Sequence, residues 1–299
     1  MSKQIETLVD DIYGLFGSEK EFDSYLSDRF GLMLAQTVQS RIGAQNKEGK
    51  GTLRMSNMGT PCLRKLWYHV NIDIEHAEPL PPYGRVKFLY GDILEELLLY
   101  LATEAGHSVE GIQDELEIDG IKGHRDAVID GVVVDIKSAS TRSFQKFKNH
   151  LTKEEDAFGY IPQLMQYLWA SKNDPLVTDK NRAAFLAIDK TLGHICLDIH
   201  ESDGVNYDNY VNFTRDAINS PNIPSRAFSD EPDGMSGNMK LCTQCSYCEW
   251  KKKCWPGVRT YLYSGGPRYL TVVKKEPRVQ ESGTYLDSGP YKRETPGHR

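Results

Sequence analysis

The sequence predicts an α/β fold in which helices flank a mixed sheet, and three observations predict it. An apolar stripe at helical spacing predicts a long helix over about 84–105. Residues 123–137 read as two strands around Asp130-Gly131, a dipeptide typical of a two-residue hairpin turn because both central residues need positive φ. A helix that begins at about Pro162 comes next, and a second hairpin follows it. The order of helix, strands, helix and strands predicts one α/β core.

The other elements are predicted from the same patterns. In chain order they are two or three helices over 3–45, a glycine-rich linker over 43–51, a short helix over 61–70, a strand near 108–118, a hairpin of 182–189 and 194–200, and a helix over 205–218. From about residue 264 the chain is rich in glycine, proline and charge, which predicts an extended or disordered tail. We therefore expect a helical N-terminal region and linker (1–50), one domain (51–257) and a tail (258–299).

The first hairpin carries the residues that point to chemistry. Folding about Asp130-Gly131 places Asp126 across from Asp135, with Cβ atoms roughly 5 Å apart, where like charges destabilise a hairpin unless a cation lies between them. The strand period of two puts Lys137 on the same face, with His124 across from it. Carboxylates are the ligands that Mg²⁺ and Mn²⁺ prefer, and a lysine beside them can orient an attacking water. The alternative is a surface hairpin with solvated acids, and a longer turn would shift every pair.

These residues resemble the PD-(D/E)XK nuclease superfamily, whose namesake motif Asp126 and Asp135-Ile136-Lys137 match. Gln163-Leu-Met-Gln-Tyr167 is similar to the Q-x-x-x-Y helix of RecB-like nucleases. Gly91-Asp-Ile-Leu-Glu95 is similar to their upstream helix, in which a metal ligand follows a glycine by four residues. Most members with an iron–sulfur cluster have histidine at that position, whereas this chain has Glu95, as in the phage-exonuclease branch. The resemblance covers about residues 55–257.

The resemblance implies a restriction-endonuclease-like core and a Mg²⁺- or Mn²⁺-dependent DNA exonuclease. It implies these metal ligands: Glu95, Asp126, Asp135 and Ile136. It implies this catalytic set: Asp126, Asp135, Lys137, Glu95, Gln163 and Tyr167. Glu96 competes with Glu95 for the role of ligand, and Tyr167 has ordinary packing as its alternative. For His124 a structural hydrogen bond competes with catalysis.

Six cysteines add a second feature. The spacing of Cys245, Cys248 and Cys254 resembles the cluster-binding tail of the CRISPR-adaptation nucleases and the AddAB helicase–nuclease, and Cys62 resembles their upstream fourth ligand. The resemblance implies a [4Fe–4S] cluster in the segment 242–257, with zinc or free thiols as alternatives because thiolates suit both metals. Cys242 could replace one ligand. The remaining cysteine, at position 196, is expected to be a small buried hydrophobe.

A basic segment with interleaved aromatic residues follows the catalytic strand. Phosphates could bind Arg142, Lys146 and Lys148, and bases could stack on Phe144 or Phe147. The alternative is a solvated helix with buried phenylalanines. A second basic run, 251–253, could also contact the DNA backbone.

Composition limits the classes of function. The net charge of −6 over 299 residues argues against a general polyanion-coating protein, although a nuclease needs only a local basic path. Neither a signal-like N-terminus nor an apolar run of about 20 residues is visible, so we expect a reducing cytoplasm, prokaryotic or phage-infected, and no membrane. The expected partners are DNA with free ends, replication or recombination proteins, and a second copy of the chain. Rival functions are a non-enzymatic DNA-binding recombination or replication partner and a structure-specific endonuclease.

Overall fold

The computed structural model describes residues 3–282 except 18, 20 and 43–47. The chain divides into two compact units, residues 1–225 and 226–299. This boundary differs from the expected division at 257, because the cysteine-rich segment belongs with the strands that follow it rather than with the first unit.

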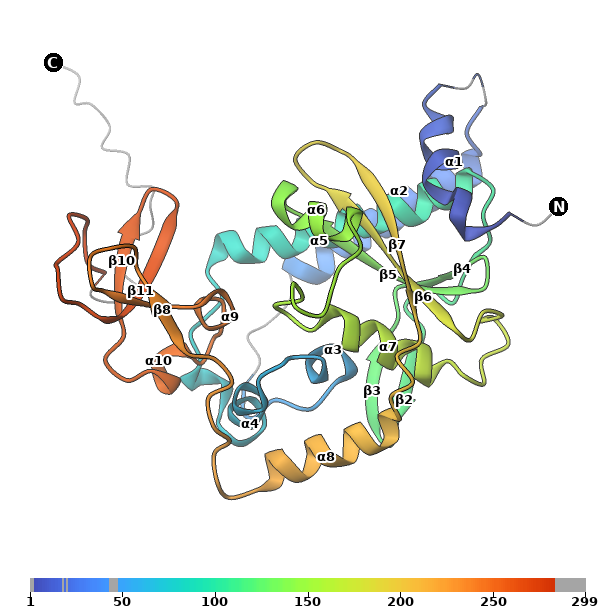
Figure 1. The fold of residues 1–299 in the computed structure, drawn as a ribbon. Coiled ribbons are helices and arrows are strands. Elements are labelled where there is room, and N and C mark those ends of the chain that lie inside the picture. Colours follow the sequence, from blue (N-terminus) through green and yellow to red (C-terminus); the bar gives the residue numbers. More distant parts are fainter. Residues whose placement is uncertain (1–2, 18, 20, 43–47, 283–299) are drawn as a thin grey trace, which may run out of the picture. The chain divides into compact units, whose positions relative to one another are not determined.

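The first unit is built on a mixed five-stranded sheet of order β1-β4-β5-β6-β7 (Figure 1). Its strands are β1 (Val109–Glu110), β4 (Ala127–Ile129), β5 (Val132–Ala139), β6 (Arg182–Asp189) and β7 (Ile195–Glu201). Strands β5 and β6 are parallel, and the other neighbours are antiparallel. The sheet is therefore mixed, as the sequence predicts.

Helices cover both faces of this sheet. Helices α1 (Leu8–Leu15) and α5 (Pro82–Glu104) share one buried cluster with it, because the alternate residues Val134 and Ile136 of β5 point to that side. The other face carries α3 (Met55–Met58), α6 (Thr141–Lys148), α7 (Tyr160–Ala170) and α8 (Tyr207–Asn219). Peripheral elements are η1 (Ile5–Thr7), α2 (Ser24–Ile42), which packs on α5, α4 (Leu63–Asn71), which packs on α8, and η2 (Ile74–His76). The result is a three-layer α/β/α arrangement.

The expected hairpin is present in the expected register. Ala127 pairs with Val134, and Ile129 pairs with Val132. The φ angles of Asp130 and Gly131 are 49° and 81°, as a type I′ turn requires. Because alternate residues of β5 face opposite sides, Asp135 and Lys137 share the face that α6 and α7 cover.

The expected position of His124 is wrong. The segment near 108–118 is not one strand: β2 (Glu115–Ile118) pairs with β3 (Ile121–His124) in a separate two-stranded sheet, where His124 faces Glu115 rather than Lys137. The chain leaves the central sheet at Arg125, whose guanidinium is fully buried and binds the Asp114 carboxylate. Arg125 thus anchors the chain at the point where β3 ends and the central sheet begins.

The second unit contains a four-stranded sheet of order β10-β11-β9-β8. Its elements are β8 (Asp230–Pro232), β9 (Met239–Leu241), α9 (Thr243–Ser246), α10 (Lys251–Cys254), β10 (Arg259–Tyr263) and β11 (Gly266–Val272). The prediction of an extended or disordered tail from 258 is thus wrong for 259–272, because Tyr261 and Leu270 are buried in this sheet. The rest of that prediction, over 283–299, lies outside the described residues.

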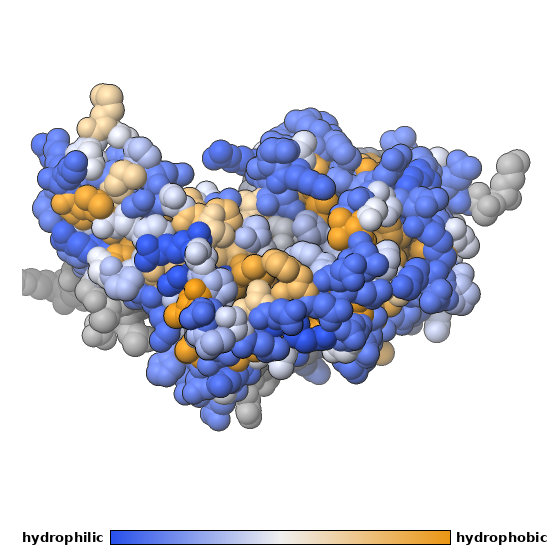
Figure 2. Space-filling model, turned by 60° about the horizontal axis from the view of Figure 1, so that its bottom comes forward, coloured by the Kyte–Doolittle hydropathy of each residue, from blue (hydrophilic) through white to orange (hydrophobic). Residues whose placement is uncertain are grey.

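The surface is mostly polar, in keeping with a chain of which 26% is charged. Figure 2 shows a face that is largely hydrophilic, with hydrophobic residues in small groups. Within the described ranges, no helix is both long enough and apolar enough to cross a membrane.

Candidate active site

Three carboxylates from three separate parts of the chain meet beside the middle of β5. Glu95 comes from α5, Asp126 from the bend before β4, and Asp135 from β5 itself. The β4–β5 ladder ends one pair before Asp126, whose Oδ2 instead accepts a hydrogen bond of 2.6 Å from the backbone N–H of Ile136. This bond fixes Asp126 beside Asp135, so the two carboxylates are neighbours although they are not a ladder pair.

Burial and neighbouring charge raise the pKa of two of these carboxyl groups, Glu95 and Asp126. Burial, followed by the charges of Asp126 and Asp135, raises the pKa of Glu95 to about 8. Burial and the charge of Asp135 raise the pKa of Asp126 to about 7. A divalent cation beside these carboxyl groups would stabilise their ionised form.

Lys137 supplies one positive charge to this group. Its ammonium forms an ion pair with the Asp135 carboxylate and lies 5.0 Å from the centre of the Tyr160 ring. Burial opposes the charge of Lys137, but Asp135 and Asp126 outweigh burial and raise its pKa. When all are ionised, three carboxylates and one ammonium leave two negative charges, which matches a divalent ion.

Gln113 is a site residue that the sequence did not reveal. Its side-chain amide donates to Glu95 Oε1 at 2.6 Å and to Asp126 Oδ1 at 3.5 Å. The amide N–H groups therefore lie between two carboxylates, at the place where a bound cation is expected. The residue is exposed and has a φ of 55°, in an irregular loop between β1 and β2, so neither strand nor helix periodicity identifies it.

The Q-x-x-x-Y residues lie on one face of α7. Gln163 donates a hydrogen bond of 3.1 Å to the hydroxyl of Tyr167. Burial raises the pKa of Tyr167 to about 12, and the charges of Asp135 and Asp126 act in the same direction. Tyr167 therefore interacts electrostatically with the carboxylate site, and it is also a buried core residue.

The side chains of Glu96 and Ile136, the two remaining candidate ligands, both point away from the carboxylate site. Glu96 receives a hydrogen bond from Thr37 of α2, so it faces that helix and Glu95 faces the carboxylate site. The side chain of Ile136 is buried in the cluster on the opposite face of the sheet. Only a backbone oxygen of Ile136 could therefore act as a ligand.

The basic segment after β5 forms α6, and one expectation about it is wrong. Phe144 is 1% exposed and belongs to the core, so its ring offers no surface on which a base could stack. Its burial follows from helical spacing, since Phe144 and Phe147 share the face of α6 that packs on the sheet. Arg142 and Lys148 are exposed, and Lys146 donates to the backbone oxygen of Glu155 at 2.8 Å.

The cysteines lie in both units. Cys62 precedes α4 in the first unit, whereas Cys242, Cys245, Cys248 and Cys254 belong to the second. Burial, with the neighbouring Cys242 and Cys248 as further causes, raises the pKa of Cys245 to about 12, and Cys242 is hydrogen-bonded to it. The six cysteines all lie within the described residues, and none of them forms a disulfide. Cys196 is only partly buried, beside the core rather than within it. In the described part of the chain, no set of cysteines gathers into a closed metal site.

Comparisons with known proteins show little beyond this geometry. No protein-family model matches the chain, and no curated protein matches it. The crystal structure of SSO0001 is a distant structural neighbour, with 16% sequence identity over 75% of this chain and 95% of that one. The TM-score is 0.39, and at that value the likeness carries no argument about function.

Proposed function

We propose that the chain is a metal-dependent DNA exonuclease of the RecB-like PD-(D/E)XK type. The observation that carries the proposal is the convergence of Glu95, Asp126 and Asp135 beside Lys137. The donor set fits Mg²⁺ or Mn²⁺, because it consists of carboxylate oxygens with two negative charges in excess. The motif resemblance supplies the substrate class.

In this proposal Glu95, Asp126 and Asp135 would hold the ion, and the backbone oxygen of Ile136 would be a further ligand. A bound Mg²⁺ or Mn²⁺ lowers the pKa of a coordinated water and neutralises charge on a scissile phosphate. Lys137, fixed by Asp135 and the Tyr160 ring, orients the attacking water and stabilises negative charge as it develops. The amide of Gln113, which donates to Glu95 and Asp126, would have to give up these hydrogen bonds for the two carboxylates to hold the ion.

The test is digestion of end-labelled linear DNA and closed circular DNA, with Mg²⁺ or Mn²⁺ titrated into metal-free protein. An exonuclease releases nucleotides from the linear DNA and leaves the circles intact. Cut circles would mean an endonuclease. Binding without products from either DNA would contradict the enzyme and favour a non-catalytic DNA-binding partner.

The cysteine segment supports a second part of the proposal, a structural [4Fe–4S] cluster. Anaerobically purified protein is expected to be brown and to contain about four iron atoms per chain. Serine at Cys245, Cys248, Cys254 or Cys62 is expected to remove the colour and lower the melting temperature. Iron analysis and visible absorbance measure both effects.

Cys242 is the control for the cluster, because the structure places it against Cys245. Cys242→Ser is expected to keep the iron, since the family resemblance assigns the fourth ligand to Cys62. Iron lost from Cys242→Ser but kept in Cys62→Ser would move the fourth ligand to Cys242. Stoichiometric zinc with negligible iron would overturn the cluster.

The basic residues of α6 are expected to bind phosphates. Lys146→Ala combined with Lys148→Ala should weaken binding to all single-stranded sequences similarly, and should flatten the slope of log K against log salt by about 0.7 for each phosphate that is no longer neutralised. Phe144→Ala should instead lower thermal stability and leave binding by the folded protein unchanged, because the ring is buried. An unchanged slope in the double variant would place the DNA elsewhere.

A further inference from the structure

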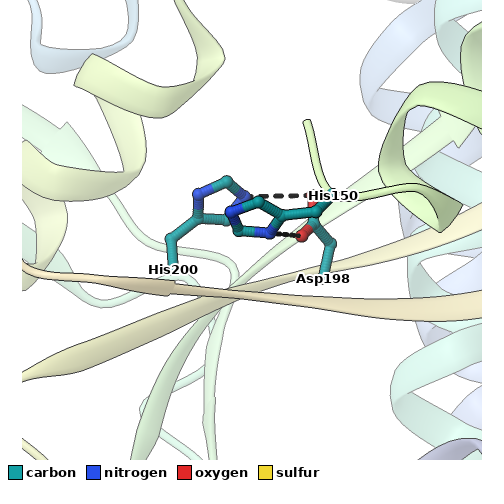
Figure 3. Close-up of side chains that lie close together, drawn as sticks. All are labelled: His150, Asp198 and His200. Atoms are coloured by element: carbon teal, nitrogen blue, oxygen red, sulfur yellow. Dashed lines mark hydrogen bonds and ion pairs between the residues drawn. The ribbon is translucent and has the colours of Figure 1, made fainter. Parts of the chain in front are cut away.

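Three side chains of metal-ligating type meet away from the carboxylate site (Figure 3). His150 comes from the loop after α6, whereas Asp198 and His200 lie two residues apart on β7 and so point to the same face of the sheet. One nitrogen or oxygen atom from each residue lies within 4.8 Å of the others. The group thus joins a loop to a strand that follows it by about fifty residues.

Both imidazoles turn a nitrogen toward the same carboxylate. His150 Nδ1 lies 2.8 Å from Asp198 Oδ1, and His200 Nε2 lies 3.0 Å from Asp198 Oδ2. The two rings are stacked, with centroids 4.5 Å apart and planes 22° apart. Two nitrogens and a carboxylate oxygen therefore face one small volume.

Two of the three residues are held rigidly before any ion binds. The side chain of Asp198 is 2% exposed, and its Oδ2 also accepts a hydrogen bond from the backbone N–H of Leu151. His200 is buried as well, with its ring edge-on to Phe185 at 5.3 Å. A buried carboxylate on a strand needs a compensating positive charge or a full set of donors.

The third residue is exposed and reaches the group from a strained backbone. The His150 side chain is 62% exposed, and its φ is 68°. The left-handed conformation costs a residue other than glycine about 1–2 kcal/mol. Such an outlier beside a buried carboxylate points to a functional reason for the position of the ring.

We propose that His150, Asp198 and His200 bind one zinc ion, with a fourth position open to water. Histidine nitrogens and a carboxylate oxygen are common zinc ligands. At ordinary zinc–ligand bond lengths, the ligand atoms of a tetrahedral site lie about 3.3 Å apart. The observed separations of 2.8 and 3.0 Å need only a small outward movement. The exposed side of His150 leaves room for the water.

This site is separate from the carboxylate site and selects a different ion. Asp135, Phe185 and Asp198 are successive neighbours across β5, β6 and β7, so Asp198 lies two strand spacings, about 10 Å, from Asp135. Two-metal catalytic sites hold their ions about 4 Å apart, so the zinc is not a second catalytic ion. Its role is instead structural: through His150, Asp198 and His200 it links the loop after the basic helix α6 to β7.

Zinc titration of metal-free protein in excess Mg²⁺ tests the site, since Mg²⁺ occupies the carboxylates. His150→Ala is the main variant, because its side chain is exposed and its loss leaves the core intact. His76→Ala is the matched control, an exposed histidine elsewhere in the first unit. The cysteines contribute equally to all three proteins, so the comparison isolates the histidine site.

The wild type and His76→Ala are expected to bind one zinc per chain more tightly than His150→Ala does. The affinity of that site should fall by at least about a hundredfold in His150→Ala, since even the loss of an outer partner of a metal ligand costs about 10–100-fold. Equal zinc binding by the wild type and His150→Ala would overturn the proposal. An equal loss in His76→Ala would also overturn it, because the binding would then belong to exposed histidines in general.

Discussion

Asp126→Asn is expected to abolish DNA cleavage while raising the stability of the metal-free protein. The asparagine oxygen can still accept the hydrogen bond from the N–H of Ile136, so the bend before β4 is kept. The substitution removes the negative charge of one cation ligand, and we expect the cleavage rate to fall by about a thousandfold, the upper end of what one electrostatic group contributes to a transition state. Cleavage assays beside melting curves in EDTA measure the two effects.

The matched control uses two adjacent glutamates on α5. Glu95→Gln should behave like Asp126→Asn, because Glu95 faces the carboxylate site. Glu96→Gln should retain cleavage, because Glu96 faces Thr37 of α2. Similar activity in the two glutamine variants would remove Glu95 from the ligand set, and near-wild-type turnover in Asp126→Asn would remove the site altogether.

Arg125→Ala is expected to cause the largest loss of stability. The guanidinium is fully buried and binds the carboxylates of Asp114 and Asp174, the hydroxyl of Ser171 and the backbone oxygen of Gly111. Removing it leaves these acceptors without their donor and opens a cavity, and such changes cost about 3–5 kcal/mol. We expect about 3 kcal/mol, because both carboxylates are partly exposed. Urea unfolding should show a lower midpoint with an unchanged slope.

Arg215→Ala is the comparison for this variant. Arg215 binds Asp119 at 2.7 Å in the same unit, but both side chains are about a third or more exposed. Exposed ion pairs contribute about 0–1 kcal/mol, so its loss should shift the midpoint little. If the two arginine variants lost equal stability, the contacts of the buried Arg125 would contribute no more than an exposed ion pair does.

Local patterns predicted the elements whose geometry is local. The Asp130-Gly131 turn set its own register, and the long helix and α7 followed from apolar spacing and Pro162. The β2–β3 hairpin was missed although Asp119-Gly120 carries the same turn signal, with φ angles of 46° and 80°. Its strands are short and half-exposed, so their alternation is weak. The second-unit sheet was missed because glycine and proline outweighed the alternation around Tyr261.

The candidate site was predictable where it depends on the hairpin and not where it depends on loops. Asp126, Asp135 and Lys137 meet because two strands and a turn place them. The position of Gln113 depends on an irregular loop, and that of His124 on the ion pairs of the buried Arg125. At the proposed zinc site the spacing of Asp198 and His200 was visible in the sequence. Their meeting with His150 depends on how the loop after α6 folds back on β7.

The central claim is that Glu95, Asp126 and Asp135 form a divalent-cation site, and unfolding across pH in EDTA and in Mg²⁺ tests it most directly. The folded-state pKa values of Glu95 and Asp126, about 8 and 7, lie above the ordinary values of 4.5 and 3.8. Between those limits the folded protein holds more protons than the unfolded chain, so the free energy of unfolding should fall as pH rises from about 4 to 8 in EDTA. Mg²⁺ should largely reverse that fall, and Asp126→Asn should flatten it. A stability profile that neither Mg²⁺ nor Asp126→Asn alters would contradict the site.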